Sequence, residues 1–156
     1  MTNTWKNDPQ TLIRLKQRAT TDDSGSVRRA AVQKLARSFK DDPQTKAILK
    51  QRATTDDSGS VRRTAVQELA RNFKDDPQTL MWLKQHVTTD DMFVRRAAVQ
   101  ELARSFKDDP QTKAILKQRA ITDDDEYVRR AAVQELARSF KDDPQTKAIL
   151  KHNLYL

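Results

Sequence analysis

One segment recurs along almost the whole sequence. The tetrapeptide Asp-Pro-Gln-Thr returns at spacings of 34, 34, 33 and 34 residues, beginning at Asp8, Asp42, Asp76, Asp109 and Asp143. The tripeptide Val-Arg-Arg follows the same period, beginning at Val27, Val61, Val94 and Val128. A period of roughly 20–50 residues is typical of tandem arrays, in which each unit packs only on its neighbours. The repetition therefore favours an array over a single globular bundle.

Each repeat carries two helical signals. The first, here called helix A, opens with Asp-Pro, where Asp8 suits the N-cap and Pro9 the first helical position. A polar segment at residues 20–26 ends it, and helix B follows from Val27 to Phe39. We expect units at residues 8–41, 42–75, 76–108 and 109–142 and a partial unit at 143–156, within a single repeat domain spanning 1–156.

These signals predict an all-α fold. One helix pair cannot bury its apolar face alone, whereas stacked pairs share a continuous core. With only 2 Gly and 5 Pro in 156 residues, the chain has few turn residues outside the predicted loops. The expected architecture is a solenoid, a right-handed α–α superhelix of about four helix pairs plus a terminal helix.

The two ends of the array are irregular. Trp5 aligns with Phe39, so the chain opens on the tail of a helix B. It closes with a helix A that lacks a B partner, followed by Leu154, Tyr155 and Leu156. Two interpretations stay open: these last residues form a cap, or the chain is a segment of a longer array. Uncapped ends would favour end-to-end self-association.

Several functional classes find no support in the sequence. The chain has no cysteine, no apolar run as long as a membrane helix and no signal-peptide pattern, so we expect a soluble cytoplasmic protein without membrane contact. His86 and His152 do not repeat, and no nucleophile, base and orienting acid come together. The aspartates lack the ligand spacing of a calcium loop. We predict no catalytic residue, no metal and no cofactor: the protein is not an enzyme.

Adjacent arginines point in different directions on a helix, so the two arginines of each Val-Arg-Arg are expected to differ in role. Arg28 falls within the apolar arc of its helix B and needs polar partners there. The Asp pair in the preceding loop, with loop carbonyls, is the nearest source. We expect a structural Asp–Arg ladder that ties each unit to its neighbour, formed by Asp22, Arg28, Asp56, Arg62, Asp90, Arg95, Asp123 and Arg129.

The second arginine lies on the opposite, exposed side of helix B. Together with a Gln and an Arg further along each helix it forms columns across the array, at Arg29, Gln33, Arg37, Arg63, Gln67, Arg71, Arg96, Gln100, Arg104, Arg130, Gln134 and Arg138. Glu68, Glu101 and Glu135 each precede one of these arginines by three residues and are expected to pair with it. Two interpretations stay open: a solvated face, or a stripe that binds a partner.

A few side chains depart from the repeat. The third loop is one residue shorter and carries Met92 and Phe93, which we interpret as packing residues, with a contact site as the alternative. Trp82 replaces the smaller Arg14, Ile48 and Ile115 of other repeats. We interpret it as core filler, with a base-stacking platform as the alternative.

The segment from Asp22 to Leu35, DDSGSVRRAAVQKL, resembles the second half of short HEAT-like repeats of the phycobilisome-lyase type. The resemblance implies a ladder of Asp before helix B and Arg after Val, which in the third repeat has Thr89 at the Asp position and Asp90 as its substitute. The longer phrase VRRAAVQELARSFKDDPQT is similar to the arrays appended to bacterial NACHT-type signalling NTPases. A weaker likeness, around DPQTLIRLK, is to leucine-rich-variant repeats.

Such arrays bind proteins, and occasionally nucleic acid, on the surface lined by helix B, and this is what the resemblance implies here. The net charge of +8 favours an acidic protein partner. We therefore expect a non-catalytic interaction scaffold. The alternatives are a module that binds the phosphate backbone of nucleic acid, and a ligand-sensing segment of a larger signalling NTPase. Nucleic acid is disfavoured by the Glu column and by the lack of an exposed aromatic series among the arginines.

Overall fold

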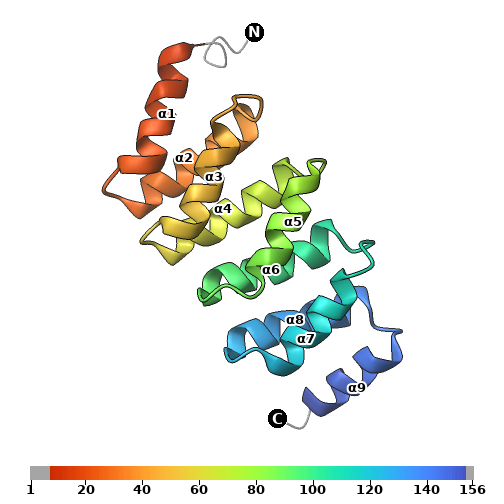
Figure 1. Ribbon diagram of the computed structural model, residues 1–156. Helices are drawn as coiled ribbons and strands as arrows, with labels where there is room; N and C mark the ends of the chain where they lie inside the picture. The colour runs from red at the N-terminus through yellow and green to blue at the C-terminus, as the bar shows by residue number, and fades with distance from the viewer. Residues whose placement is uncertain (1–7, 154–156) are drawn as a thin grey trace. The chain divides into compact units, whose positions relative to one another are not determined.

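The computed structural model describes residues 8–153, which form nine α-helices and no strand (Figure 1). The all-helical prediction is therefore confirmed over this range. Trp5 and residues 154–156, to which the sequence interpretation gave roles at the ends, lie outside the described residues. The helices are α1 (Pro9–Thr21), α2 (Gly25–Ser38), α3 (Thr45–Thr55), α4 (Gly59–Asn72), α5 (Pro77–His86), α6 (Met92–Ser105), α7 (Thr112–Thr122), α8 (Glu126–Ser139) and α9 (Pro144–Asn153).

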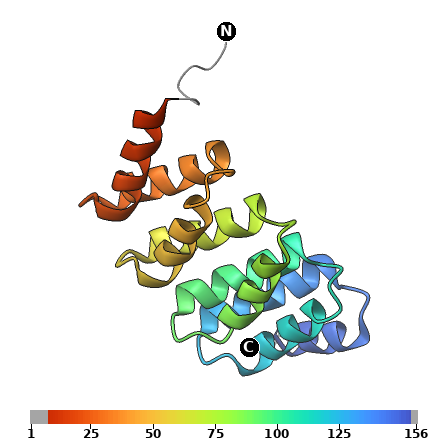
Figure 2. The ribbon, with the colours of Figure 1, turned by 45° about the horizontal axis from the view of Figure 1, so that its top comes forward.

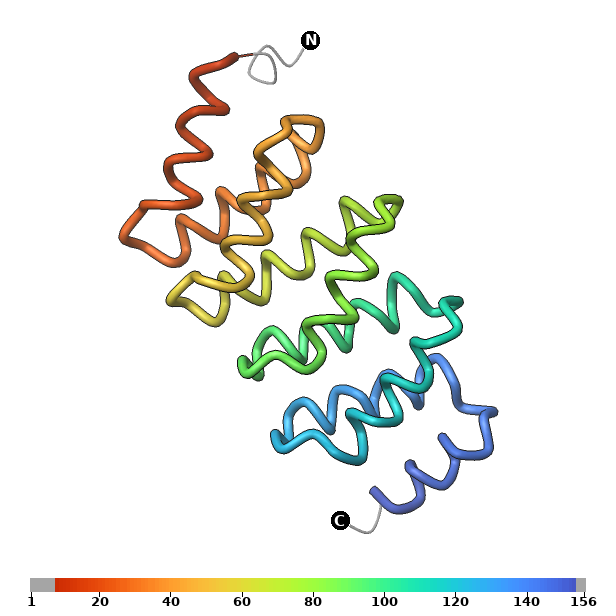
Figure 3. The backbone as a smooth tube through the Cα atoms, viewed as in Figure 1, coloured from red at the N-terminus to blue at the C-terminus, as the bar shows by residue number. Residues whose placement is uncertain are grey.

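The odd-numbered helices are the A helices and the even-numbered ones are the B helices. A and B helices alternate along the chain and are joined by short loops (Figure 3). The chain divides into two compact units. Unit 1 ends at Asp76 and contains α1–α4, whereas unit 2 begins at Pro77 and contains α5–α9. Within each unit the B helices pack on one another, α2 beside α4 and α6 beside α8 (Figure 2). Each unit therefore has an inner layer of B helices that its A helices cover on one side.

The core is built mainly from the B helices. In unit 1, Val32 and Leu35 of α2 and Val66 and Leu69 of α4 are fully buried, and Leu49 of α3 meets them from the A layer. The two residues named in each B helix are three positions apart, which places them on one helix face. Burying each such side chain stabilises the fold by about 1.5–3 kcal/mol.

Val27 differs from its counterparts in the later repeats. The sequence projection placed it in the core, but it is 38% exposed, whereas Val61, Val94 and Val128 are buried. Val61 lies on α4, which packs beside α2. In the part of unit 1 that is described, no B helix precedes α2, so Val27 lacks a neighbour of the kind that α4 has in α2.

The Asp-Pro start of helix A takes two forms. At α1 the helix begins at Pro9, and the Asp8 carboxylate accepts a 3.0 Å bond from the Gln10 amide, as an N-cap does. In the second and fourth repeats the Asp-Pro pair instead forms a tight turn, and α3 begins only at Thr45. The reason is local: the Thr45 amide bonds back three residues to the Asp42 carbonyl, at 3.1 Å, before α-helical bonding begins.

The threonine of Asp-Pro-Gln-Thr joins this turn to the preceding helix B. Thr45 is fully buried, and its hydroxyl donates to the Phe39 carbonyl at 2.7 Å. Thr112 repeats the bond to Phe106, also at 2.7 Å. The hydroxyl of Thr79, at the same repeat position and equally buried, has no hydrogen-bond partner among the described residues.

This difference predicts unequal effects of the same substitution. Thr45→Val should lower the free energy of unfolding by about 1 kcal/mol, because a buried hydroxyl–carbonyl bond is lost. Thr79→Val should cost less or stabilise, because it removes a buried hydroxyl that makes no bond. Urea unfolding of both variants measures the difference. Equal losses would show that the bond to Phe39 carries no stability.

Candidate interaction surface

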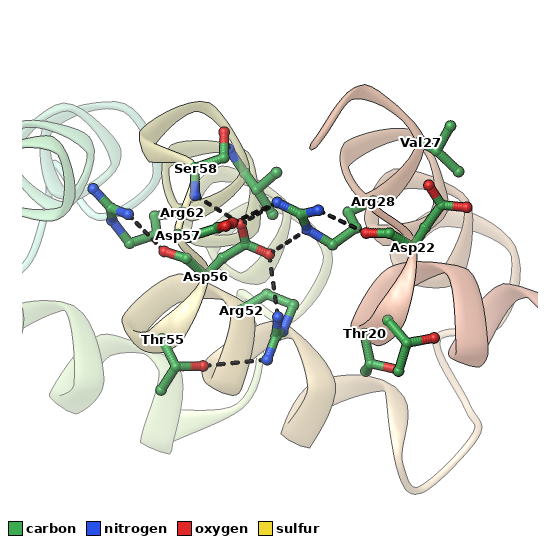
Figure 4. A network of polar contacts seen from close by, with 12 residues as sticks. Thr20, Asp22, Val27, Arg28, Arg52, Thr55, Asp56, Asp57, Ser58 and Arg62 are labelled. Carbon is green, nitrogen blue, oxygen red and sulfur yellow. Dashed lines mark hydrogen bonds and ion pairs between the residues drawn. The ribbon is translucent and has the colours of Figure 1, made fainter. Parts of the chain in front are cut away.

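The first arginine of helix B links consecutive repeats. Arg28 on α2 is only 7% exposed and reaches the loop before α4 (Figure 4). Its Nε and Nη2 donate to the two carboxylate oxygens of Asp56, at 2.9 and 3.0 Å, and Nη2 also reaches Asp57, at 2.6 Å. Its Nη1 donates to the carbonyls of Asp22 and Asp23, at 2.7 and 3.2 Å. One guanidinium thus binds its own loop through the backbone and the next loop through carboxylates.

Unit 2 repeats this arrangement. Arg95 on α6 donates from Nε and Nη2 to the Asp123 carboxylate, both at 3.1 Å, and from Nη2 to Asp124, at 2.9 Å. Its Nη1 binds the carbonyls of Thr89 and Asp90, at 2.9 and 3.0 Å. The bidentate geometry is the strong form of an arginine–carboxylate contact.

These contacts correct part of the expected ladder. The loop preceding each helix B was named as the nearest source of carboxylates, yet Asp22 contributes its carbonyl, and its carboxylate accepts instead from the Ser24 amide, at 2.9 Å. In the third repeat Asp90 also contributes a carbonyl, beside that of Thr89. The other two ladder arginines hold their own loops in the same way: Arg62 Nη1 donates to the Asp56 carbonyl and Arg129 Nη1 to the Asp123 carbonyl, each at 2.6 Å.

The buried carboxylates of the ladder stay ionised. Burial by itself raises the pKa of Asp56, but hydrogen bonds from Arg28, the Ser58 amide and Arg52 outweigh it, so the pKa lies below its ordinary value. The pKa of Asp123 is lowered in the same way, with Arg95 as the principal partner against burial. The contacts that link consecutive repeats are therefore ion pairs between charged groups at neutral pH.

A second set of ion pairs links consecutive B helices. Glu68 is only 2% exposed and accepts from Arg37 of the preceding helix, with Nη2 to Oε1 at 2.7 Å. In unit 2, Glu135 is 3% exposed and is contacted by Arg104 of α6, at 3.0 Å between Nη2 and Oε1, and by Arg138 of its own helix. The predicted pairing with the arginine three residues later is confirmed for Glu135 and Arg138, but the burial of these glutamates was not predicted. These carboxylates lie between B helices, where arginines neutralise them.

The second arginine stands on the solvent side. Arg29, Arg63 and Arg130 are exposed, and Arg96 is half-buried. Each is followed by a Gln four residues later and an Arg eight residues later, which keeps the three side chains within one narrow face of the helix. We call each such trio an Arg–Gln–Arg stripe; the four stripes lie on α2, α4, α6 and α8 and consist of the twelve residues named from sequence.

The contacts of the stripe arginines differ along the stripe. Arg29 donates from Nη1 to the Ser60 hydroxyl of the next B helix, at 3.3 Å. The Arg130 guanidinium lies 5.6 Å from the centre of the Tyr127 ring, within cation–π range. The last arginine of the stripe is partly engaged, as the contacts of Arg37 and Arg104 with buried glutamates show.

Exposed aromatic side chains lie next to two of the stripes, although the sequence predicts no exposed aromatic series among the arginines. Phe93, for which packing was predicted with a contact site as the alternative, lies in the first turn of α6 and is 42% exposed. Tyr127 occupies the same position in α8 and is 47% exposed. Both precede the first arginine of a stripe by three residues, a spacing that could have revealed them. Trp82 is half-buried and stacks on His86 with ring centres 3.8 Å apart.

Other chemistry finds little support in residues 8–153. No group of His, Asp and Glu there could hold a metal ion, and none of the helices in that range is long and apolar enough to span a bilayer. A groove of about 600 Å³ lies between α8 and α9, with Val133 and Leu150 in its wall and Arg130 and Gln134 at its side. It is a surface groove next to the α8 stripe, and Glu126 and Arg129 also line it.

Comparison with known families accounts for the repeated helix pairs. The sequence matches the family described as HEAT repeats at residues 4–70 and 47–137. The chain belongs to the HEAT-repeat family. No curated protein and no solved structure matches it. HEAT repeats generally serve as scaffolds for protein interaction, and the alternating A and B helices place this chain in the α-solenoid class.

The ladder of this HEAT array predicts unequal roles for adjacent aspartates. The side chain of Asp56 is fully buried, whereas that of Asp57 is 89% exposed, although both contact Arg28. Asp56→Ala should lower the free energy of unfolding by about 3 kcal/mol, because it leaves a buried arginine without its main counter-ion. Asp57→Ala, the matched control, should cost at most about 1 kcal/mol. Chemical denaturation measures both, and similar losses would contradict the assignment.

The same carboxylates predict the response to acid. Because the folded-state pKa values of Asp56 and Asp123 are lowered, their contribution to stability is full above the unfolded pKa of about 4 and is lost as the pH falls through the folded values. The denaturation midpoint should therefore decline steadily below about pH 4. The double variant Asp56→Asn/Asp123→Asn should be less stable at neutral pH and show a flatter acid profile. Parallel profiles would exclude these two aspartates as the cause.

Proposed function

We propose that this HEAT array is a non-catalytic recognition module that holds an acidic protein segment against the exposed faces of its B helices. The observation that carries the proposal is the separation of charge on those helices. Glu68 and Glu135 are buried and neutralised between helices, whereas the first arginine of the stripe is exposed in three of the four repeats. Along the stripes, the charge left to solvent is therefore positive.

The chemistry of the stripe suits carboxylates. An arginine offers five N–H donors in a planar fork that matches a carboxylate, and a neighbouring glutamine both donates and accepts. In unit 1 the exposed Lys34 adds a further cation to α2. Charge complementarity of this kind speeds association and selects partners by sign. An acidic, extended segment of another protein is the ligand that this pattern favours.

The alternatives named from sequence use the same surface. A sensing segment of a signalling NTPase, suggested by the resemblance of the repeat phrase, would also act by binding a ligand to the array. Nucleic acid would contact the stripes through its phosphates, and such binding falls steeply with salt concentration. Self-association through the ends stays a prediction, which the oligomeric state in solution tests.

Charge reversal on the stripes tests the proposal. The double variant Arg29→Glu/Arg63→Glu should weaken binding of a fluorescently labelled peptide of alternating glutamate and glycine by about tenfold, because two attractive contacts become repulsive. The free energy of unfolding should change by no more than about 0.5 kcal/mol, since both side chains are exposed. Fluorescence anisotropy at low salt measures the binding.

The matched control reverses two exposed arginines on the other layer of the same unit. Arg14→Glu/Arg18→Glu changes the net charge equally, but on α1, and should leave peptide binding nearly unchanged. If both double variants weaken binding alike, only net charge matters and the stripes are not the site. If the parent protein binds duplex DNA but not the peptide, the nucleic-acid alternative replaces the proposal.

A further inference from the structure

The two units differ at one position of the helix-B surface. The residue three before the first stripe arginine is Ser26 or Ser60 in unit 1, but Phe93 or Tyr127 in unit 2. In each case it lies in the first turn of a B helix, on the same face as the stripe. Each stripe of unit 2 therefore has an aromatic side chain at its N-terminal end, whereas each stripe of unit 1 has a serine hydroxyl there.

The two aromatic rings are exposed at equivalent positions of neighbouring helices. Phe93 is 42% exposed and Tyr127 47% exposed, and the helices that carry them, α6 and α8, pack side by side. Single exposed apolar residues are common on protein surfaces. Here two large ones share a register, and packed helices lie about 8–10 Å apart, which leaves room for one side chain of a partner between the rings.

The charges around the rings determine what kind of partner fits. On the loop side, Asp124 has a side chain that is 92% exposed, and the exposed Glu126 immediately precedes Tyr127. On the helix side stand Arg96 and Arg130, the latter in cation–π contact with Tyr127. A uniformly charged polyanion would meet repulsion at the loop end. A polypeptide can match the order of carboxylate, aromatic and arginine along its own sequence, so the pattern favours protein over nucleic acid.

We propose that unit 2 binds one apolar side chain of the acidic segment, here called the anchor. This aromatic or large aliphatic side chain packs between Phe93 and Tyr127, and the carboxylates next to it in the segment bind Arg96 and Arg130. This inference rests on the proposed function and refines its ligand class. Unit 1, with serines at the same positions, contributes charge only. The anchor fixes where along the array the acidic segment is held, which the repeated stripes alone leave undefined.

The repeat itself supplies the test substitutions. Phe93→Ser/Tyr127→Ser introduces the residue that unit 1 carries at these positions, so the helices should form as before. Two labelled peptides are compared by fluorescence anisotropy: one of alternating glutamate and glycine, and one in which a single central glycine is replaced by phenylalanine. The parent protein should bind the phenylalanine peptide about three- to tenfold more tightly, as expected for an aromatic contact. The serine variant should bind both peptides equally.

A control removes apolar side chains of similar exposure from the A helices of unit 2. Met81 is 59% and Ile121 65% exposed, and Met81→Ala/Ile121→Thr again uses residues found at equivalent positions in other repeats. This variant should keep the preference for the phenylalanine peptide. The inference is overturned, and the proposed function stands, if the parent binds both peptides alike or if the control loses the preference as the serine variant does. If neither peptide binds the parent, both proposals fail.

A single-stranded oligothymidine serves as the third probe. Its binding should be weaker than that of the phenylalanine peptide and should not depend on Phe93 and Tyr127. If instead only the oligonucleotide binds, and binding is lost in the serine variant, the rings stack on bases and the peptide assignment is wrong.

Discussion

The contact between the first arginine of one helix B and the carboxylate before the next is the interaction on which each unit depends. A buried guanidinium is costly unless all of its donors are used. Arg28 and Arg95 meet this demand by drawing acceptors from two consecutive loops at once. The desolvated charge therefore enforces the spacing and orientation of neighbouring repeats, a role that apolar packing alone, being non-directional, does not fulfil.

The second set of ion pairs has a different effect, on the surface rather than on the stacking. Glu68 and Glu135 are buried between B helices, where arginines neutralise them. The negative charge of these two residues therefore does not reach the solvent, whereas part of the positive charge of the B helices does. The same pairs hold Arg37 and Arg104, so the last arginine of the stripes on α2 and α6 is bound to a buried carboxylate of the next B helix. The Arg–Asp contacts of the ladder thus govern the stacking, whereas the Arg–Glu contacts between B helices govern the surface charge.

The sequence predicted the helices well because their information is local. All the described helices could be predicted from the period of Asp-Pro-Gln-Thr, the spacing of the apolar positions and the composition of the loops. The burial of Arg28 followed from its place in the apolar arc of helix B. The partners of Arg28 and Glu68 were harder to predict, since a helical projection gives the direction of a side chain but not which neighbouring helix occupies that direction. Glu68 lies at the edge of the arc, and only the packing of α2 against α4 decides that it is buried. For Phe93 the sequence left packing and a contact site open, and its register on helix B, on the face of the stripe, accounts for its 42% exposure.

The ladder arginines Arg28 and Arg95 make different kinds of contact with the two loops that they join, and this difference bears on how such arrays lengthen. Toward its own loop each arginine binds only main-chain carbonyls, which any residue supplies, as Thr89 does in the shortened third loop. Toward the next loop it requires a specific carboxylate. Arg28 and Arg95 make both kinds of contact, so a duplicated repeat that keeps the arginine and the aspartate can pack on its neighbour in the same way. Residues 94–117 and 128–151, which are identical, are what such copying within a gene would leave behind.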